Sequence, residues 1–369
     1  MQLPAMLRHP VTWLLPAMLL VAGLLGAGRA GAEPYLAVQT GYKCNVCHVN
    51  PTGGGLRNDF GIIYAKTLLP AQTVDGTLDA WTGKVLDMLR IGGDLRADWS
   101  RDTAPNSPSS QSFALEQFRV YADLALIPNK LGIYIDEQVA PNGSQNEEAY
   151  VRYGSTTDGF YLKGGQFYLP FGWRLQDQTA FVREATGISM STPDKGVELG
   201  YEHQSWSAQF DVTNGASNAN SGSGYQVTSQ VVYTKPIWRL GLAGSFTQSD
   251  AGDRRVGGLF AGLKTGPIGW LAEADLIHDD SFPGGRTLAA GLLEGDWRLH
   301  RGHNLKITAE YYDPDRDVRE NQQTRWSAVY EYTPIPFLQL RAGYRHYFGI
   351  PQNNLQNQQL TFVELHGYF

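Results

Sequence analysis

The chain has 369 residues, of which 42% are hydrophobic, 12% are aromatic and only 18% are charged, and it contains 42 glycines. A low charged fraction with many glycines and aromatic residues favours a β-rich protein over a helical one. The formal net charge is −6, and no stretch concentrates basic residues, which argues against a nucleic-acid partner.

The first 32 residues have the pattern of a secretory signal peptide. Arg8 supplies a positive start, residues 13–25 are mostly apolar, and Ala30-Gly31-Ala32 resembles a cleavage site before Glu33. A transmembrane anchor is the alternative, but Pro16 interrupts the apolar run, which is shorter than the ~20 residues that a span requires. We therefore predict a signal peptide over residues 1–32 and an exported mature chain.

The two cysteines of the chain occur in one motif, Cys44-Asn-Val-Cys47-His48. Two thiols at this spacing can bond to the two vinyl groups of one haem, and the adjacent imidazole can ligate the iron. A disulfide would not require His48, zinc would need four ligands, and an iron–sulfur cluster would need four thiolates. The motif predicts one covalent haem c, bound by Cys44 and Cys47 with His48 as an axial ligand, in a cytochrome segment over residues 33–88.

The second axial ligand is less evident. Met88 is the one methionine between residues 33 and 189, and it is a candidate distal ligand to the haem iron. The alternative is that Met88 is an ordinary apolar residue at the start of a strand.

A helix is predicted over residues 58–66, after the glycine loop 53–55. Its Phe60, Ile63 and Tyr64 can lie against a haem or simply pack a small core. A segment of this size buries little apolar surface by itself, so we expect it to depend on the domain that follows.

From Leu89 onward, apolar and polar residues alternate with period two, as in β-strands. This pattern predicts sixteen strands, over residues 89–99, 113–127, 131–140, 147–154, 159–168, 196–203, 206–214, 224–234, 238–247, 255–264, 268–277, 286–298, 304–313, 324–333, 337–347 and 358–369.

The connections between these strands alternate between tight turns and long polar loops. This arrangement, with an even number of strands, is typical of an outer-membrane β-barrel and unlike a soluble β-sandwich, which is the alternative. We therefore predict an all-β fold, a transmembrane barrel over residues 89–369 of about sixteen antiparallel strands. Both termini of the mature chain would then lie on the periplasmic side.

The last strand predicts which face points inward. Val363, Leu365 and Phe369 share one face, while Glu364, His366 and Tyr368 share the other and are expected in the lumen. The same parity places six carboxylates in the lumen, where they can attract cations such as Fe(II): Asp94, Asp98, Glu294, Asp296, Glu310 and Glu364.

The longest loop covers residues 169–195. It can fold into the lumen as a constriction, lined by Arg174, Asp177, Arg183 and Glu184, or it can remain a solvated surface loop.

The layout of the whole mature chain resembles the fused monohaem cytochrome–porins, and the likeness is concentrated in residues 34–61. The matching motif is Pro-x-Leu-Ala-x-x-Thr-Gly-x-x-Cys-x-x-Cys-His, followed by a barrel that closes on Phe369. The run Gly53-Gly54-Gly55 departs from the pattern of the iron oxidisers of that family. The stretch 165–172 also looks like phosphate-selective porins.

The resemblance implies outer-membrane electron transfer between an extracellular donor or acceptor, such as Fe(II), and a periplasmic electron carrier. The activity would be that of an Fe(II):cytochrome oxidoreductase, and the other partner would be outer-membrane lipid. Two alternatives remain: a diffusion porin whose haem-bearing segment acts as a plug or redox-sensitive gate, and a haem sensor anchored by the barrel.

Overall fold

The computed structural model describes residues 33–76, 80–215 and 224–369. The predicted signal peptide, residues 1–32, therefore lies outside the described residues. Three short helical elements precede the strands: α2 (Pro34–Thr40), the 3-10 helix η1 (Cys44–Val46) and α3 (Asp59–Thr67). Within the described residues, no helix has the length and apolar character that crossing a membrane requires.

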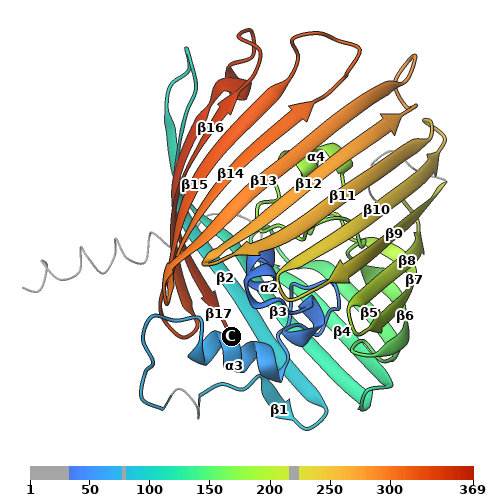
Figure 1. Ribbon diagram of the computed structural model, residues 1–369, viewed down its shortest axis with the longest axis vertical. Helices are drawn as coiled ribbons and strands as arrows, with labels where there is room; N and C mark the ends of the chain where they lie inside the picture. The colour runs from blue at the N-terminus through green and yellow to red at the C-terminus, as the bar shows by residue number, and fades with distance from the viewer. Residues whose placement is uncertain (1–32, 77–79, 216–223) are drawn as a thin grey trace, which may run out of the picture.

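The described chain then forms one antiparallel sheet (Figure 1). Its strands are β1 (Lys84–Leu86), β2 (Leu89–Thr103), β3 (Ser110–Ile127), β4 (Leu131–Ala140), β5 (Gln145–Gly154), β6 (Gly159–Phe167), β7 (Asp194–His203), β8 (Trp206–Thr213), β9 (Gly224–Thr234), β10 (Trp238–Ser249), β11 (Arg254–Thr265), β12 (Ile268–Asp279), β13 (Arg286–His300), β14 (His303–Asp313), β15 (Gln323–Ile335), β16 (Leu338–Phe348) and β17 (Gln359–Tyr368). Two further helical elements, α4 (Phe181–Thr186) and η2 (Asn354–Asn357), lie in loops.

The sheet closes on itself because the last strand pairs with the second. β17 runs antiparallel to β2, from Gln359 opposite Thr103 to Tyr368 opposite Asp94. Among the described residues, the closed barrel thus consists of sixteen strands, β2 to β17, and β1 is an addition that pairs with β2. The prediction of a sixteen-stranded antiparallel barrel is confirmed, although the sequence pattern missed β1.

Short turns gather at one end of the barrel and long loops at the other. We call the end with the short turns the turn end; it includes the turns 128–130, 204–205, 266–267 and 301–302. The chain's last residue, Phe369, also lies there, hydrogen-bonded to Gly93 at the start of β2 (Figure 1). In outer-membrane barrels the short turns face the periplasm.

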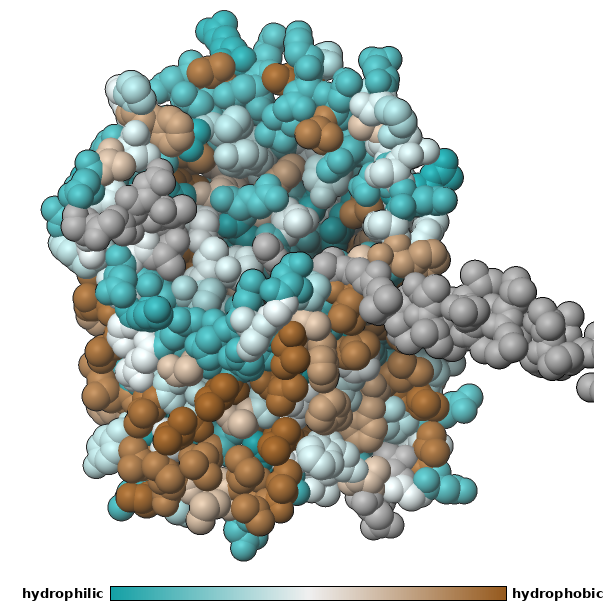
Figure 2. All heavy atoms as spheres, turned by 180° about the vertical axis from the view of Figure 1, so that it is seen from behind, coloured by the Kyte–Doolittle hydropathy of each residue, from teal (hydrophilic) through white to brown (hydrophobic). Residues whose placement is uncertain are grey.

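The strands expose apolar residues outward and bury polar ones inward. On β17, the Val363 side chain is 48% exposed, whereas Glu364, His366 and Tyr368 are buried. On β14, Ile307 is exposed while Lys306 and Glu310 are buried. Hydrophobic residues gather over the half of the visible surface nearer the turn end, and hydrophilic residues cover the other half (Figure 2). The predicted inward and outward faces are confirmed, and the outer surface is suited to lipid.

Candidate functional site

The segment before the barrel folds into the barrel's lumen at the turn end. We call residues 33–72 the plug. Figure 1 shows α2 inside the curved sheet and α3 below it, beside the C-terminus. The plug contacts the short turns directly: the Asn45 side chain donates to the Thr156 carbonyl (3.0 Å), and Lys43 donates to the Trp206 carbonyl (2.9 Å). At its end, the backbone N–H of Gln72 donates to the Pro334 carbonyl (3.0 Å).

Buried polar contacts attach the plug to the barrel wall. The Tyr35 hydroxyl donates to Glu331 on β15 (3.1 Å). On the other side of the lumen, Asn50 donates to both carboxylate oxygens of Glu148 on β5, at 3.2 and 3.1 Å. Each of these carboxylates is nearly inaccessible to water. A buried carboxylate that loses its donors is costly, so the plug and the wall stabilise one another.

The cysteine motif is held in a compact turn of the plug. η1 begins at Cys44, and the backbone N–H groups of Cys47 and His48 donate to the Cys44 carbonyl at 3.1 and 3.0 Å. His48 then forms an isolated antiparallel bridge with Arg57. The Asn58 side chain donates to the Asn45 carbonyl (3.0 Å) and also caps α3. These contacts fix the backbone that carries Cys44, Cys47 and His48.

One cavity brings these three side chains together inside the barrel. Cys44, Cys47 and His48 line it, and the two thiols are not bonded to each other. The rest of the lining comes from the plug, from the barrel wall and from the loop between β6 and β7. The lining side chains outside the motif that carry a charge, a hydroxyl, an imidazole or a thioether include Arg57, Tyr64, Asp94, Arg96, Arg174, Met190, Arg239 and His366.

Burial sets the protonation of the motif. Removal from water, with a smaller contribution from the Arg57 charge, lowers the pKa of His48 to about 3, so its imidazole is neutral at physiological pH. Burial raises the pKa of Cys47 to about 11 and also raises the pKa of Cys44. The Nδ1 atom of His48 is buried without a hydrogen-bond partner among the described residues. A neutral imidazole is the form that binds a metal.

These residues fit a covalently bound haem. Gly53 packs against Cys44, so that an added Cβ would lie 3.3 Å from the Cys44 Cβ and 3.4 Å from its sulfur. A side chain at residue 53 would therefore crowd Cys44. Haem carries two anionic propionates, and the guanidinium groups of Arg57, Arg174 and Arg239 line the same cavity. Within the described residues, no group of three or more His, Cys, Asp or Glu side chains could hold a metal ion.

Two details of the predicted haem surroundings are not borne out by the fold. The helix predicted over 58–66 is confirmed as α3, but its Phe60 and Ile63 are 40% and 56% exposed and do not line the cavity. Only Tyr64 of the three does so. Met88 lies in the turn between β1 and β2, is 52% exposed and is not part of the cavity lining. The fold therefore does not bring Met88 to the cysteine motif.

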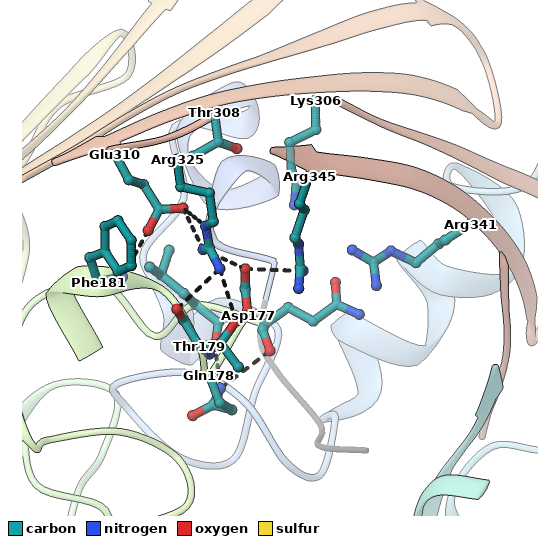
Figure 3. Close-up of polar contacts among 12 residues, drawn as sticks. Asp177, Gln178, Thr179, Phe181, Lys306, Thr308, Glu310, Arg325, Arg341 and Arg345 are labelled. Atoms are coloured by element: carbon teal, nitrogen blue, oxygen red, sulfur yellow. Dashed lines mark hydrogen bonds and ion pairs between the residues drawn. The ribbon is translucent and has the colours of Figure 1, made fainter. Parts of the chain in front are cut away.

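The long loop between β6 and β7 folds into the lumen, which was one of its two predicted alternatives, and many of its apolar side chains are buried there. We call residues 168–193 the lumen loop. Arg325 on β15 contacts Asp177 (2.7 Å) and the Thr179 carbonyl (3.1 Å) of the loop and also pairs with Glu310 (Figure 3). Arg345 reaches Asp177 as well (3.0 Å).

Other buried contacts hold the rest of the lumen loop. Arg183 pairs with Glu273 on β12, which also accepts the backbone N–H of Trp173 (2.9 Å). Arg174, Asp177 and Arg183 thus serve as anchors inside the barrel, whereas the fourth predicted residue, Glu184, is exposed.

The predicted lumen carboxylates face inward, but most are already paired. Five form ion pairs: Asp94 with Arg96, Glu294 and Asp296 with Lys306, Glu310 with Arg325, and Glu364 with Arg96 and Arg341. Asp98 has no ion pair among the described residues. The cations beside these five carboxylates reduce the negative charge that strand parity alone suggested for the lumen.

The lumen loop contributes two side chains to the cavity lining, Arg174 and Met190. Arg174 was predicted as a possible lining residue, but Met190 was missed, because no period indicates direction in a loop. His366 was expected in the lumen, and the fold places it beside the same cavity.

Comparison with known proteins supports the fold. No family model and no curated protein matches the chain. Among solved structures, a loop L8 deletion mutant of OmpT, an outer membrane protein of Vibrio cholerae, is similar with a TM-score of 0.62 at 10% identity, covering 77% of this chain and 100% of that chain. An anion-selective porin from Comamonas acidovorans gives a TM-score of 0.61 at 11% identity, covering 76% and 99%.

A third similar structure is the outer membrane channel DcaP of Acinetobacter baumannii, with a TM-score of 0.56 at 12% identity, covering 76% of this chain and 97% of that chain. At this level of identity the likeness concerns the fold. The chain thus has the fold of a porin-type outer-membrane β-barrel, with sixteen strands in the described residues.

Proposed function

We propose that this barrel transfers electrons across the outer membrane through a haem c bound to the plug. Cys44 and Cys47 would hold the haem covalently, His48 would ligate its iron, and the arginines that line the cavity would bind its propionates. The cofactor supplies one-electron redox chemistry at the iron. The observation that carries the proposal is that both thiols and a neutral imidazole share one cavity inside the barrel.

The protein's contribution would be position and electrostatics. The plug would keep the cofactor in the lumen, where the barrel wall separates it from lipid. A donor outside the cell, such as Fe(II), would lose one electron and become Fe(III). A periplasmic carrier would gain that electron at the turn end. A haem within the lumen would lie nearer to the external donor than a haem on the periplasmic face, which the whole ~30 Å hydrocarbon layer would separate from that donor.

The second candidate function is a diffusion porin with a plug. The likeness to an anion-selective porin and to an outer membrane channel favours it. The plug argues against free passage in this state, because it and the lumen loop both fill the lumen and meet at Arg174 and Gly53. A porin would require the plug to move.

Haem attachment is tested first. The full chain is produced with a c-type haem maturation system and separated on a denaturing gel that is stained for haem peroxidase activity. We expect stain in the wild type and in the exposed-site control Met88→Ala, and none in Cys44→Ser/Cys47→Ser. If the wild-type protein is produced with the maturation system and folds but carries no covalent haem, the proposal is refuted.

Function is tested next in vesicles. For electron transfer, an external donor that cannot cross the membrane should reduce a cytochrome enclosed on the turn-end side, and Cys44→Ser/Cys47→Ser should abolish this reduction. For a diffusion porin, ion conductance in planar bilayers should be high and unchanged by the same double substitution. High conductance without electron transfer would favour the porin.

A further inference from the structure

The cavity contains a methionine that no strand pattern indicates. Met190 belongs to the lumen loop, is only 6% exposed and lines the cavity together with Cys44, Cys47 and His48. After residue 32 the chain has just two methionines, Met88 and Met190. Since Met88 lies outside the cavity, Met190 supplies the single thioether that the described residues bring to it.

The positions of the histidines leave few other candidates for a second metal ligand in this cavity. Seven histidines follow residue 32, and of these only His48 and His366 are among the described residues that line the cavity. Both ring nitrogens of His366 are engaged: Nδ1 contacts Gln339 (3.0 Å), and Nε2 contacts Asp94 (3.0 Å) and Arg96 (3.1 Å). To ligate a metal, His366 would have to give up buried contacts with charged groups, which is costly. Within the part of the chain that the structure describes, the thioether of Met190 has no such competing bond.

The lumen loop is also held next to the cysteine motif. Arg174 donates from Nη1 to the Gly53 carbonyl (3.2 Å), and Gly53 packs on Cys44. Arg174 and Met190 also line a second, smaller cavity together. Arg174 thus contacts the plug at Gly53 and shares both cavities with Met190.

The position of Met190 is fixed by its own surroundings. Its backbone N–H donates to the Gln178 side chain (2.8 Å). The turn around it is closed by the Thr192 hydroxyl, which accepts from the Ser189 N–H (2.9 Å) and donates to the Gly187 carbonyl (3.0 Å). A ligand held in this way loses little further conformational freedom when it binds a metal.

We propose that Met190 is the second axial ligand of the haem iron, in addition to His48. This inference rests on the proposed function. It gives the lumen loop a task beyond narrowing the barrel, since the loop would supply a ligand while the plug supplies the cofactor. His/Met ligation also raises the reduction potential relative to His/His ligation.

The test compares ligand-sensitive spectra of the full protein in detergent. In the oxidised wild type we expect the iron–methionine charge-transfer band, unchanged in Met88→Ala and in His366→Gln. Met190→Ala should lose the band, and Met190→His should replace it with a bis-histidine signature by electron paramagnetic resonance. Because the sixth position is then vacant, Met190→Ala should also bind imidazole about tenfold more tightly or better.

Covalent haem content is measured in every variant, which separates the two proposals. A wild type without haem refutes the proposed function. A wild type that contains haem but shows a bis-histidine spectrum, lost in His366→Gln and kept in Met190→Ala, refutes the role of Met190. Loss of the band in Met190→Ala could also come from a folding defect. Met190→His controls for this, because a bis-histidine spectrum in that variant requires residue 190 to reach the iron.

Discussion

The guanidinium group of Arg174 donates a hydrogen bond to the carbonyl of Gly53, 3.2 Å away, and so joins the lumen loop to the plug. The same guanidinium also lies over the Tyr168 ring, 5.2 Å from its centre. Two segments that are separated by 121 residues in sequence thus meet at Gly53, which packs against Cys44.

If the proposed haem is bound, we predict that Arg174→Ala lowers its midpoint potential. Loss of a nearby cation favours the oxidised iron, which carries one more positive charge. At the effective dielectric of a protein the effect is about 1.4 kcal/mol, or ~60 mV for one electron. Spectroelectrochemical titration measures it. Arg174→Lys is the matched control and should keep most of the wild-type potential; equal shifts in both variants would show that packing, and not charge, is responsible.

Gly55 is predicted to be essential for seating the plug. Its φ is +62°, and an added Cβ would collide with the Tyr134 hydroxyl, which accepts the N–H of Leu56 at 3.1 Å. We expect Gly55→Ala to cost roughly 1–2 kcal/mol in backbone strain and a further 1–3 kcal/mol from overpacking. Faster amide hydrogen exchange in residues 49–58 would report the loosened plug.

Gly76 offers a matched control for this substitution. Its φ is +76°, but nothing lies within 4 Å of an added Cβ. Gly76→Ala should therefore show only the cost of strain and leave exchange in residues 49–58 unchanged. If the two variants behave alike, contact with Tyr134 does not determine how the plug is seated.

The ion pair between Asp59 and Arg90 is predicted to make docking of α3 pH-dependent. Two hydrogen bonds of 2.7 Å connect the carboxylate to the guanidinium, and Arg90 lowers the pKa of Asp59 below its ordinary value of 3.8. A carboxylate with a lowered pKa stabilises the folded state above its unfolded pKa, and this stabilisation is lost as the pH falls through the folded pKa. The contribution is therefore complete at neutral pH and absent in strong acid.

The size of this effect is small because the Asp59 side chain is 57% exposed. We expect Asp59→Asn to destabilise docking of α3 by about 0.5 kcal/mol at pH 7 in low salt, and less in high salt. Amide exchange in residues 60–67 at several pH values measures it. An equal difference between variant and wild type at neutral and strongly acidic pH would contradict this assignment.

Much of the barrel was predictable because its signal is periodic. In a sheet with one polar and one apolar side, the residues of each strand must alternate between polar and apolar. Val363 and Glu364 therefore predict opposite faces even when the neighbouring strands are unknown. The turn chemistry then marks the strand ends. β1 was missed because three residues are too few to establish a period, and it forms only because β2 is there to pair with it.

The lumen was less predictable, because its contacts join residues that are distant in sequence. Parity correctly placed Glu310 and Glu364 inside, yet it could not reveal that Arg325, Arg96 and Arg341 neutralise them. Pairing depends on the register of neighbouring strands and on the direction of the lumen loop. Both are consequences of closing the barrel.

The sequence alone determined the sixteen alternating strands, the face of each strand, and the one motif that predicts a covalent haem. It could do so because strand period and the Cys-x-x-Cys-His spacing are local properties. The tertiary structure decided where the motif lies and which side chains share its cavity. It placed the exposed Met88 outside the cavity and Met190 in the cavity lining, although Met190 lies in a loop more than 140 residues from the motif. Only the folded barrel positions the plug and the lumen loop against each other.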